Sequence, residues 1–172
     1  DSKSLMRCPP RKASESLFAR GGIACTLFYG ALITVIGLAA FLVLPCGILA
    51  AEGELVGNPF TWVERLRELM SREQILAKSQ TYAFTVLGMC QLYHAIGMRD
   101  VQKSVFAMRP WENPLMVLAC VIGFALQFAV TEVPFLIGAF GTSHLSGQEW
   151  LLLNVLAAFP LLAHELVVML RK

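Results

Sequence analysis

The chain has 172 residues and a formal net charge of +2 at pH 7. Hydrophobic residues make up 56% of the chain and charged residues 15%, whereas about 25% of a typical soluble domain is charged. This balance excludes a disordered tail, a collagen-like repeat and a nucleic-acid binder, and it predicts an all-α membrane protein with the lipid bilayer as a partner.

Four segments reach the roughly 20 apolar residues that a helix needs to cross a bilayer. The expected transmembrane helices are 22–44, 79–97, 114–134 and 150–172, the last including the cytosolic end. Between and before them we expect a cytosolic loop at 1–21, an outer loop at 45–78, a cytosolic loop at 98–113 and an outer loop at 135–149.

Residues typical of helix ends border these spans. Pro45 is expected to end the first helix. Asn113 before Pro114 is typical of an N-cap followed by proline at the first helical position. Ser146 and Glu149 have the spacing of a capping box before the last span.

Capping-box spacing occurs twice more in the first outer loop, in the pairs Thr61 with Glu64 and Ser71 with Gln74. The first pair accompanies apolar residues at helical spacing, namely Trp62, Leu66 and Leu69. We therefore expect a short amphipathic helix on the membrane surface. The second pair predicts that the next helix starts well outside the membrane.

The distribution of Lys and Arg predicts the orientation. Ten of the 14 lie in the segments assigned to the cytosol and four lie in 45–78. Both termini are therefore expected in the cytosol, and the compact loops and short tail favour a bacterial plasma membrane. The five cysteines form no CxxC pair, which indicates reduced thiols rather than a zinc site or a disulfide framework.

The first span carries a small residue at every fourth position. These residues are Gly22, Thr26, Gly30 and Thr34. Such a stripe lets the backbone of another helix approach closely, so we interpret it as a helix-packing face.

The second span is the most polar of the four, and its candidate ligands are Gln91 and His94. An amide oxygen suits a hard cation such as Ca²⁺, so Gln91 is the candidate metal ligand. His94 is a weaker candidate because it lies near the cytosolic end. Hydrogen bonding between helices is the alternative role for both side chains.

Polar residues also occur in the last two spans. Gln127 is expected to make a structural hydrogen bond, although no partner is evident, and Glu132 is expected to be solvated at the outer edge. Pro160 should kink the last helix. His164 and Glu165 are expected to have structural roles within reach of cytosolic water.

No catalytic motif is present in the sequence. It lacks GxxxxGK[ST], GxSxG, HExxH and GxGxxG, so this chain alone offers no enzyme site and no cofactor site. Because the chain begins with Asp1 rather than Met, we expect it to be a piece of a longer polypeptide.

An ordered set of short motifs resembles the C-terminal membrane region of P-type cation-transporting ATPases of the calcium-pump class. The motifs are Met6-Arg-Cys-Pro-Pro-Arg11, Ala77-Lys-Ser-Gln-Thr-Tyr-Ala-Phe-Thr85, Ser104-Val-Phe106, Trp111-Glu-Asn113, Val133-Pro-Phe-Leu136, Phe140-Gly-Thr142, Leu145-Ser-Gly-Gln-Glu-Trp150 and Glu165-Leu166. They occur in the family's order over nearly the whole chain.

The resemblance implies the last four helices of such a pump. The sites for ATP and Mg²⁺ and the phosphorylated aspartate then lie upstream, and the partners are the upstream transmembrane helices and the cytosolic domains. The transported cation is expected to be Ca²⁺, and the resemblance places Gln91 at the one ligand position of the family's eighth helix. Two alternatives remain open at this point, a self-contained four-helix accessory subunit and a membrane anchor.

Overall fold

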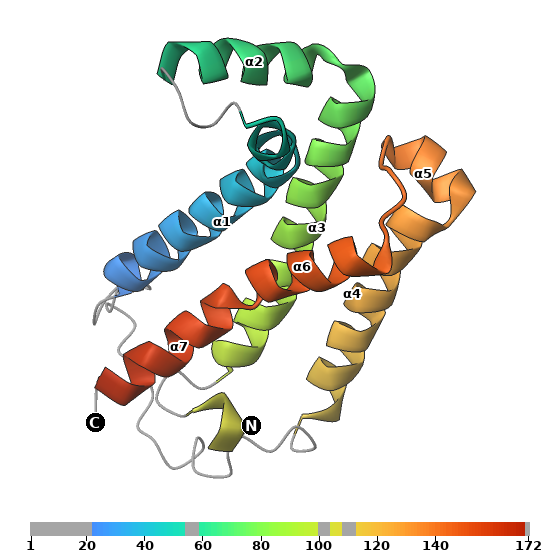
Figure 1. Ribbon diagram of the computed structural model, residues 1–172. Coiled ribbons are helices and arrows are strands. Elements are labelled where there is room, and N and C mark those ends of the chain that lie inside the picture. The colour runs from blue at the N-terminus through green and yellow to red at the C-terminus, as the bar shows by residue number, and fades with distance from the viewer. Residues whose placement is uncertain (1–21, 54–58, 100–103, 108–112, 171–172) are drawn as a thin grey trace, which may run out of the picture.

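The computed structural model describes residues 22–53, 59–99, 104–107 and 113–170, and every regular element within these ranges is a helix (Figure 1). The expected cytosolic loop 1–21 lies outside the described residues, as do 54–58 in the first outer loop, 100–103 and 108–112 in the second cytosolic loop, and the last two residues.

Helix α1 (Gly22–Ala51) continues past Pro45, so the expectation that this proline ends the helix is wrong. A proline inside a helix removes one backbone hydrogen bond and bends the helix, but packing on both sides keeps the turns in place. Pro45 is fully buried, and so is Leu49 one turn later. Figure 1 shows that α1 bends toward its C-terminal end, because its last turns are seen end-on while the rest of the helix runs across the view.

Helix α2 (Pro59–Ser71) is the amphipathic helix expected in the first outer loop, and it lies across the ends of α1 and α3 (Figure 1). Leu69 is buried against the bundle and Trp62 is half-buried, whereas the charged side chains are mostly exposed. The helix begins at Pro59, two residues before Thr61, so Thr61 is not its N-cap.

Helix α3 (Glu73–Gly97) is the centre of the bundle, since it packs against α1, α2, α4, α6 and α7. Its N-cap is Arg72, which makes no side-chain capping bond. Ser71 instead donates a 2.6 Å hydrogen bond back to the carbonyl of Glu68, so the predicted capping box with Gln74 does not form.

Helices α4 (Pro114–Glu132) and α5 (Pro134–Phe140) follow the short 3-10 helix η2 (Val105–Ala107). The Asn113 cap forms as predicted, with its side-chain oxygen accepting a 3.2 Å hydrogen bond from the backbone N–H of Met116. Helix α4 packs mainly against α3 and α5, and Thr131 is its one fully buried residue. The left-handed backbone of Gly141 ends α5.

Helices α6 (Gly147–Ala157) and α7 (Phe159–Leu170) form the last long stretch, broken at Ala158. The break lies two residues before Pro160, whose missing N–H cannot bond back along the helix, and it confirms the predicted kink. The capping box of Ser146 and Glu149 is present with both of its hydrogen bonds.

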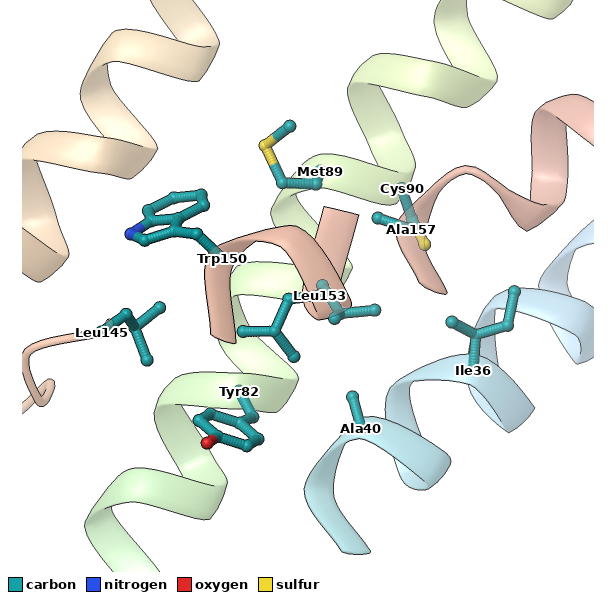
Figure 2. Close-up of a cluster of buried hydrophobic side chains, with 10 residues drawn as sticks. Ile36, Ala40, Tyr82, Met89, Cys90, Leu145, Trp150, Leu153 and Ala157 are labelled. Carbon is teal, nitrogen blue, oxygen red and sulfur yellow. The ribbon is translucent and has the colours of Figure 1, made fainter. Parts of the chain in front are cut away.

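One cluster of buried apolar side chains holds α1, α3 and α6 together (Figure 2). Ile36 and Ala40 come from α1, while Tyr82, Val86, Met89 and Cys90 come from α3. Leu145 and α6 residues Trp150, Leu153 and Ala157 fill the third side. The core therefore sits beside the middle of α3.

Among the residues that the structure describes, three stretches are long and apolar enough to cross a membrane, namely α1, α4 and the stretch Gly147–Leu170. Helix α3, which contains the second expected span, has 25 residues but more polar side chains and is not in this set. Its central position explains its composition, because polar side chains of a helix wrapped by other helices meet protein partners rather than lipid.

Candidate functional site

Helix α3 has a buried face and an exposed face. The fully buried side includes Ser79, Thr81, Tyr82, Thr85, Val86, Met89 and Cys90. From residue 80 onward, the exposed residues recur at intervals of three and four and form a stripe along one face. They are Gln80, Phe84, Leu87, Gln91, Ala95 and Met98. We call this stripe the open face of α3, because helices of the described chain cover the other sides.

Gln91 lies in the middle of this open face. Its side chain is exposed, and within the described part of the chain it makes no hydrogen bond. An amide in a membrane span needs a partner, and the described residues supply none to the Gln91 side chain.

His94, the weaker candidate, points elsewhere. It is half-buried, and its ring packs against the ring of Tyr29 on α1 with 4.4 Å between the centroids. The structure therefore does not bring Gln91 and His94 to one site, although they lie three residues apart.

The small-residue stripe of α1 is largely uncovered. Thr26, Gly30 and Thr34 are exposed and Gly22 is half-buried. A methyl group added at Gly30 would meet no atom within 4 Å, and the Thr34 hydroxyl donates a 2.8 Å hydrogen bond to the Gly30 carbonyl. The described helices leave this face free for another helix.

Gln127 of α4 makes a hydrogen bond to a partner that the sequence alone did not reveal. Its amide nitrogen donates a 3.4 Å hydrogen bond to the hydroxyl of Thr85 on α3. The close approach depends on Gly88, where an added Cβ would lie 2.5 Å from the Gln127 side-chain oxygen. The expected structural role of Gln127 is confirmed.

Glu149 joins α3 to the start of α6. Its carboxylate lies 2.7 Å from the ammonium of Lys78 and also accepts a short hydrogen bond from the hydroxyl of Tyr82. The other carboxylate oxygen accepts bonds from the backbone N–H and the hydroxyl of Ser146, at 2.7 and 2.9 Å. Sequence reasoning found the capping box but missed the two α3 partners, although Lys78 and Tyr82 stand one turn apart.

Glu132, at the end of α4, is bound rather than solvated, so that expectation is wrong. Its carboxylate accepts a 3.2 Å hydrogen bond from the indole N–H of Trp150 and lies 2.8 Å from the ring of His144. The indole N–H of a mostly buried tryptophan needs an acceptor, and Glu132 supplies it.

Two further hydrogen bonds join α3 to α6 and η2 to α7. The Tyr93 hydroxyl donates a 3.1 Å hydrogen bond to the Asn154 side chain. The backbone N–H of Val105 donates a 2.5 Å bond to Glu165. His164 is only 2% exposed, so the expectation that cytosolic water reaches it is wrong, because its ring packs on the backbone of Gly97.

No group of three or more His, Cys, Asp or Glu side chains converges within the described residues. Gln91 is thus a single ligand candidate, and its remaining ligands would have to be supplied by other helices.

The family described as "Cation transporting ATPase, C-terminus" matches residues 1–170. The chain is 30% identical over all 172 residues to "Calcium-transporting ATPase 1" of Bacillus cereus, but spans only 18% of that protein's length. Over 85 residues, 49% of the chain, it is 33% identical to "Calcium-transporting ATPase 2, endoplasmic reticulum-type" of Arabidopsis thaliana, of which the matched part is 8%. Over 85 residues it is also 32% identical to "Calcium-transporting ATPase" of Bacillus subtilis, of which the matched part is 9%.

Proposed function

The chain belongs to the family of cation-transporting ATPase C-termini, and from this premise we propose that it is the C-terminal membrane part of an ATP-driven P-type pump that transports Ca²⁺. The family match over residues 1–170 carries the proposal, and the names of the similar proteins support calcium as the cation. ATP and Mg²⁺ belong to parts of the pump outside this chain, since the sequence holds no phosphate-binding motif. The match also disfavours a self-contained accessory subunit or anchor.

In this proposal α3 also crosses the membrane, so that the chain has four transmembrane helices. Its length suits a bilayer, and it stands between the apolar helices α1, α4 and α6. Helices α2 and α5 lie at one end of the bundle and η2 at the other, as expected for two outer loops and one cytosolic loop (Figure 1).

We place both termini in the cytosol of a bacterial cell, with the protein in the plasma membrane. The ten-to-four distribution of Lys and Arg supports the orientation. The similar proteins of two Bacillus species support the bacterial setting.

Gln91 donates its amide oxygen to the transported cation, together with ligands from upstream helices that dock on the open face of α3. Its exposure and its lack of a described partner support this role. The small-residue stripe of α1, from Gly22 to Thr34, packs against the same upstream part of the pump. His94 contributes less, because its ring already packs on Tyr29.

Cation-dependent ATPase activity of the full-length pump tests the role of Gln91. Gln91→Ala should raise the Ca²⁺ concentration for half-maximal activity by about tenfold, equivalent to about 1.4 kcal/mol of binding free energy. Gln80→Ala is the matched control, since Gln80 is an exposed glutamine on the same face of the same helix. Wild-type calcium dependence in Gln91→Ala, at normal expression, would exclude Gln91 as a ligand.

A further inference from the structure

We propose that Glu149 is a positioning residue for cation binding: it fixes the rotation and height of α3 and thereby aims Gln91 out of the open face. The inference rests on the proposed ligand role of Gln91. It concerns a carboxylate at the start of α6, which pairs with Lys78 near the N-terminal end of α3 and is not itself proposed as a calcium ligand.

On the α3 side, two side chains from adjacent turns bind the same carboxylate oxygen. Lys78 forms an ion pair with it at 2.7 Å, and the hydroxyl of Tyr82 donates a hydrogen bond to it. Because the two donors lie on successive turns, rotating α3 or sliding it along its axis would break at least one of these bonds. Charge-assisted bonds of this kind are stronger than neutral ones.

On the α6 side, Glu149 is itself held in one position. Its second oxygen accepts hydrogen bonds from both the backbone N–H and the hydroxyl of Ser146. The carboxylate therefore belongs to the capping box at the N-terminus of α6. Its side chain is 19% exposed, and that of Lys78 is 33% exposed, so water screens the pair only in part. A fixed anchor on α6 therefore holds a defined side of α3.

The loop before α6 adds a third bond to the same region of α3. The hydroxyl of Thr81 accepts a 2.9 Å hydrogen bond from the backbone N–H of Ser143. The ring of Tyr82 meanwhile lies in the core beside Ala40 and Leu153 (Figure 2). Three polar bonds, made by Lys78, Thr81 and Tyr82, thus resist rotation of α3.

Helical geometry carries this constraint to Gln91. Gln91 lies nine positions after Tyr82, which corresponds to about 2.5 helical turns and about 13 Å along the helix axis. A half-integral number of turns puts Gln91 on the side of α3 opposite Tyr82, in agreement with the 3% exposure of Tyr82 and the exposure of Gln91. Holding Tyr82 toward α6 therefore holds Gln91 away from the bundle, toward the upstream helices.

The double change Lys78→Met with Tyr82→Phe in the full-length pump tests this inference, since it removes both α3 bonds and keeps the capping box and the apolar bulk. We expect the Ca²⁺ concentration for half-maximal ATPase activity to rise about three- to tenfold, with the maximal rate per pump unchanged. This shift is smaller than the loss of about 10- to 100-fold in metal affinity or activity that is typical when a group bonded directly to a metal ligand is removed. Tyr82→Phe alone is the milder variant should the double variant fail to fold.

Glu132→Gln is the matched control, because Glu132 is a bound carboxylate at the same end of the bundle whose partners, Trp150 and His144, are not on α3. It should leave the half-maximal concentration unchanged. In a Gln91→Ala background the α3 changes should have no further effect on calcium dependence, which a general loss of stability would not produce.

Wild-type calcium dependence in the α3 variants would overturn the positioning role and leave the role of Gln91 intact. The same shift with and without Gln91→Ala would also overturn it, since Glu149 would then act through another residue. Wild-type calcium dependence of Gln91→Ala itself would overturn both proposals.

Discussion

Gln91 and Gln127 are the same residue type in neighbouring helices, and their surroundings differ completely. Gln127 bonds to Thr85 across the gap left by Gly88, whereas Gln91 has no partner within the described chain. The sequence predicted Gln91 as a candidate ligand and Gln127 as a structural residue, but it revealed no partner for Gln127. The difference depends on which face of α3 meets α4, and this follows from packing of the whole bundle.

Glycine has a packing role at Gly97 that is tested by adding one methyl group. The new Cβ of Gly97→Ala would lie 3.1 Å from Cγ and 3.3 Å from Cβ of His164, atoms near the backbone of a residue that is 2% exposed. We expect a loss of about 1–3 kcal/mol in unfolding free energy, as for other overpacked cores, seen as a lower inactivation temperature of the full-length protein.

Gly138→Ala is the control for this substitution, since an added Cβ there meets nothing within 4 Å. Alanine favours helix over glycine, so this variant of α5 should be at least as stable as the wild type. An unchanged inactivation temperature of Gly97→Ala would show that α7 moves away from α3 without cost.

At the scale of elements, four capping signals were read from the sequence and two of them form. Asn113 and Ser146 cap α4 and α6, whereas Thr61 lies inside α2 and Ser71 bonds backward to Glu68. The two that form directly precede an apolar span, where the helix has one possible start. The other two lie in the outer loop, where α2 and α3 meet and the chain has several possible helix starts.

Asn113→Ala tests one of the caps that form. It removes the acceptor for the N–H of Met116 and should cost about 1 kcal/mol of stability. Ser71→Ala provides the contrast, because its exposed hydroxyl is not a cap and its loss should stay within about 0.5 kcal/mol. Thermal inactivation of the two full-length variants measures the difference, and equal midpoints would contradict the assignment.

The two prolines in apolar helices show what sequence can predict of helix breaks. Pro160 produces the predicted break, at Ala158, whereas α1 continues through Pro45 for six more residues to Ala51. The local effect of proline is the same in both helices, a lost backbone bond. Whether the helix resumes depends on the packing that follows, and Leu49 is buried after Pro45.

At the scale of the whole molecule, α4 is peripheral and α3 is central. The four long apolar or semi-apolar stretches were predicted from composition, because each had about the length that a membrane requires. Their arrangement was not, since nothing in the order of helices says that α3 contacts five others while α4 packs mainly on two. The partners of Glu149 and Glu132 were missed for the same reason, as they join residues far apart in the sequence.

The proposed orientation predicts which helix ends are accessible from outside the cell. In a protein without native cysteines, the changes Glu64→Cys on α2 and Ala107→Cys on η2 place single thiols at exposed positions in opposite loops. An impermeant thiol reagent should label the first in intact cells and spare the second, because the Lys and Arg distribution puts η2 inside.

Permeabilised cells supply the control for this experiment, since both positions should then react. Labelling only at Ala107→Cys in intact cells would reverse the topology.

The central place of α3 has a consequence for biosynthesis. Lys78, the buried threonines and Gln91 make α3 the helix that lipid alone solvates worst, and the cost of inserting such side chains falls when neighbouring helices provide partners. Helix α1 leaves the ribosome before α3, but the α4 and α6 partners Gln127 and Glu149 leave after it. A nascent chain that ends after α3 therefore lacks these partners, and we expect this helix to enter the bilayer stably only after the rest of the bundle has been translated.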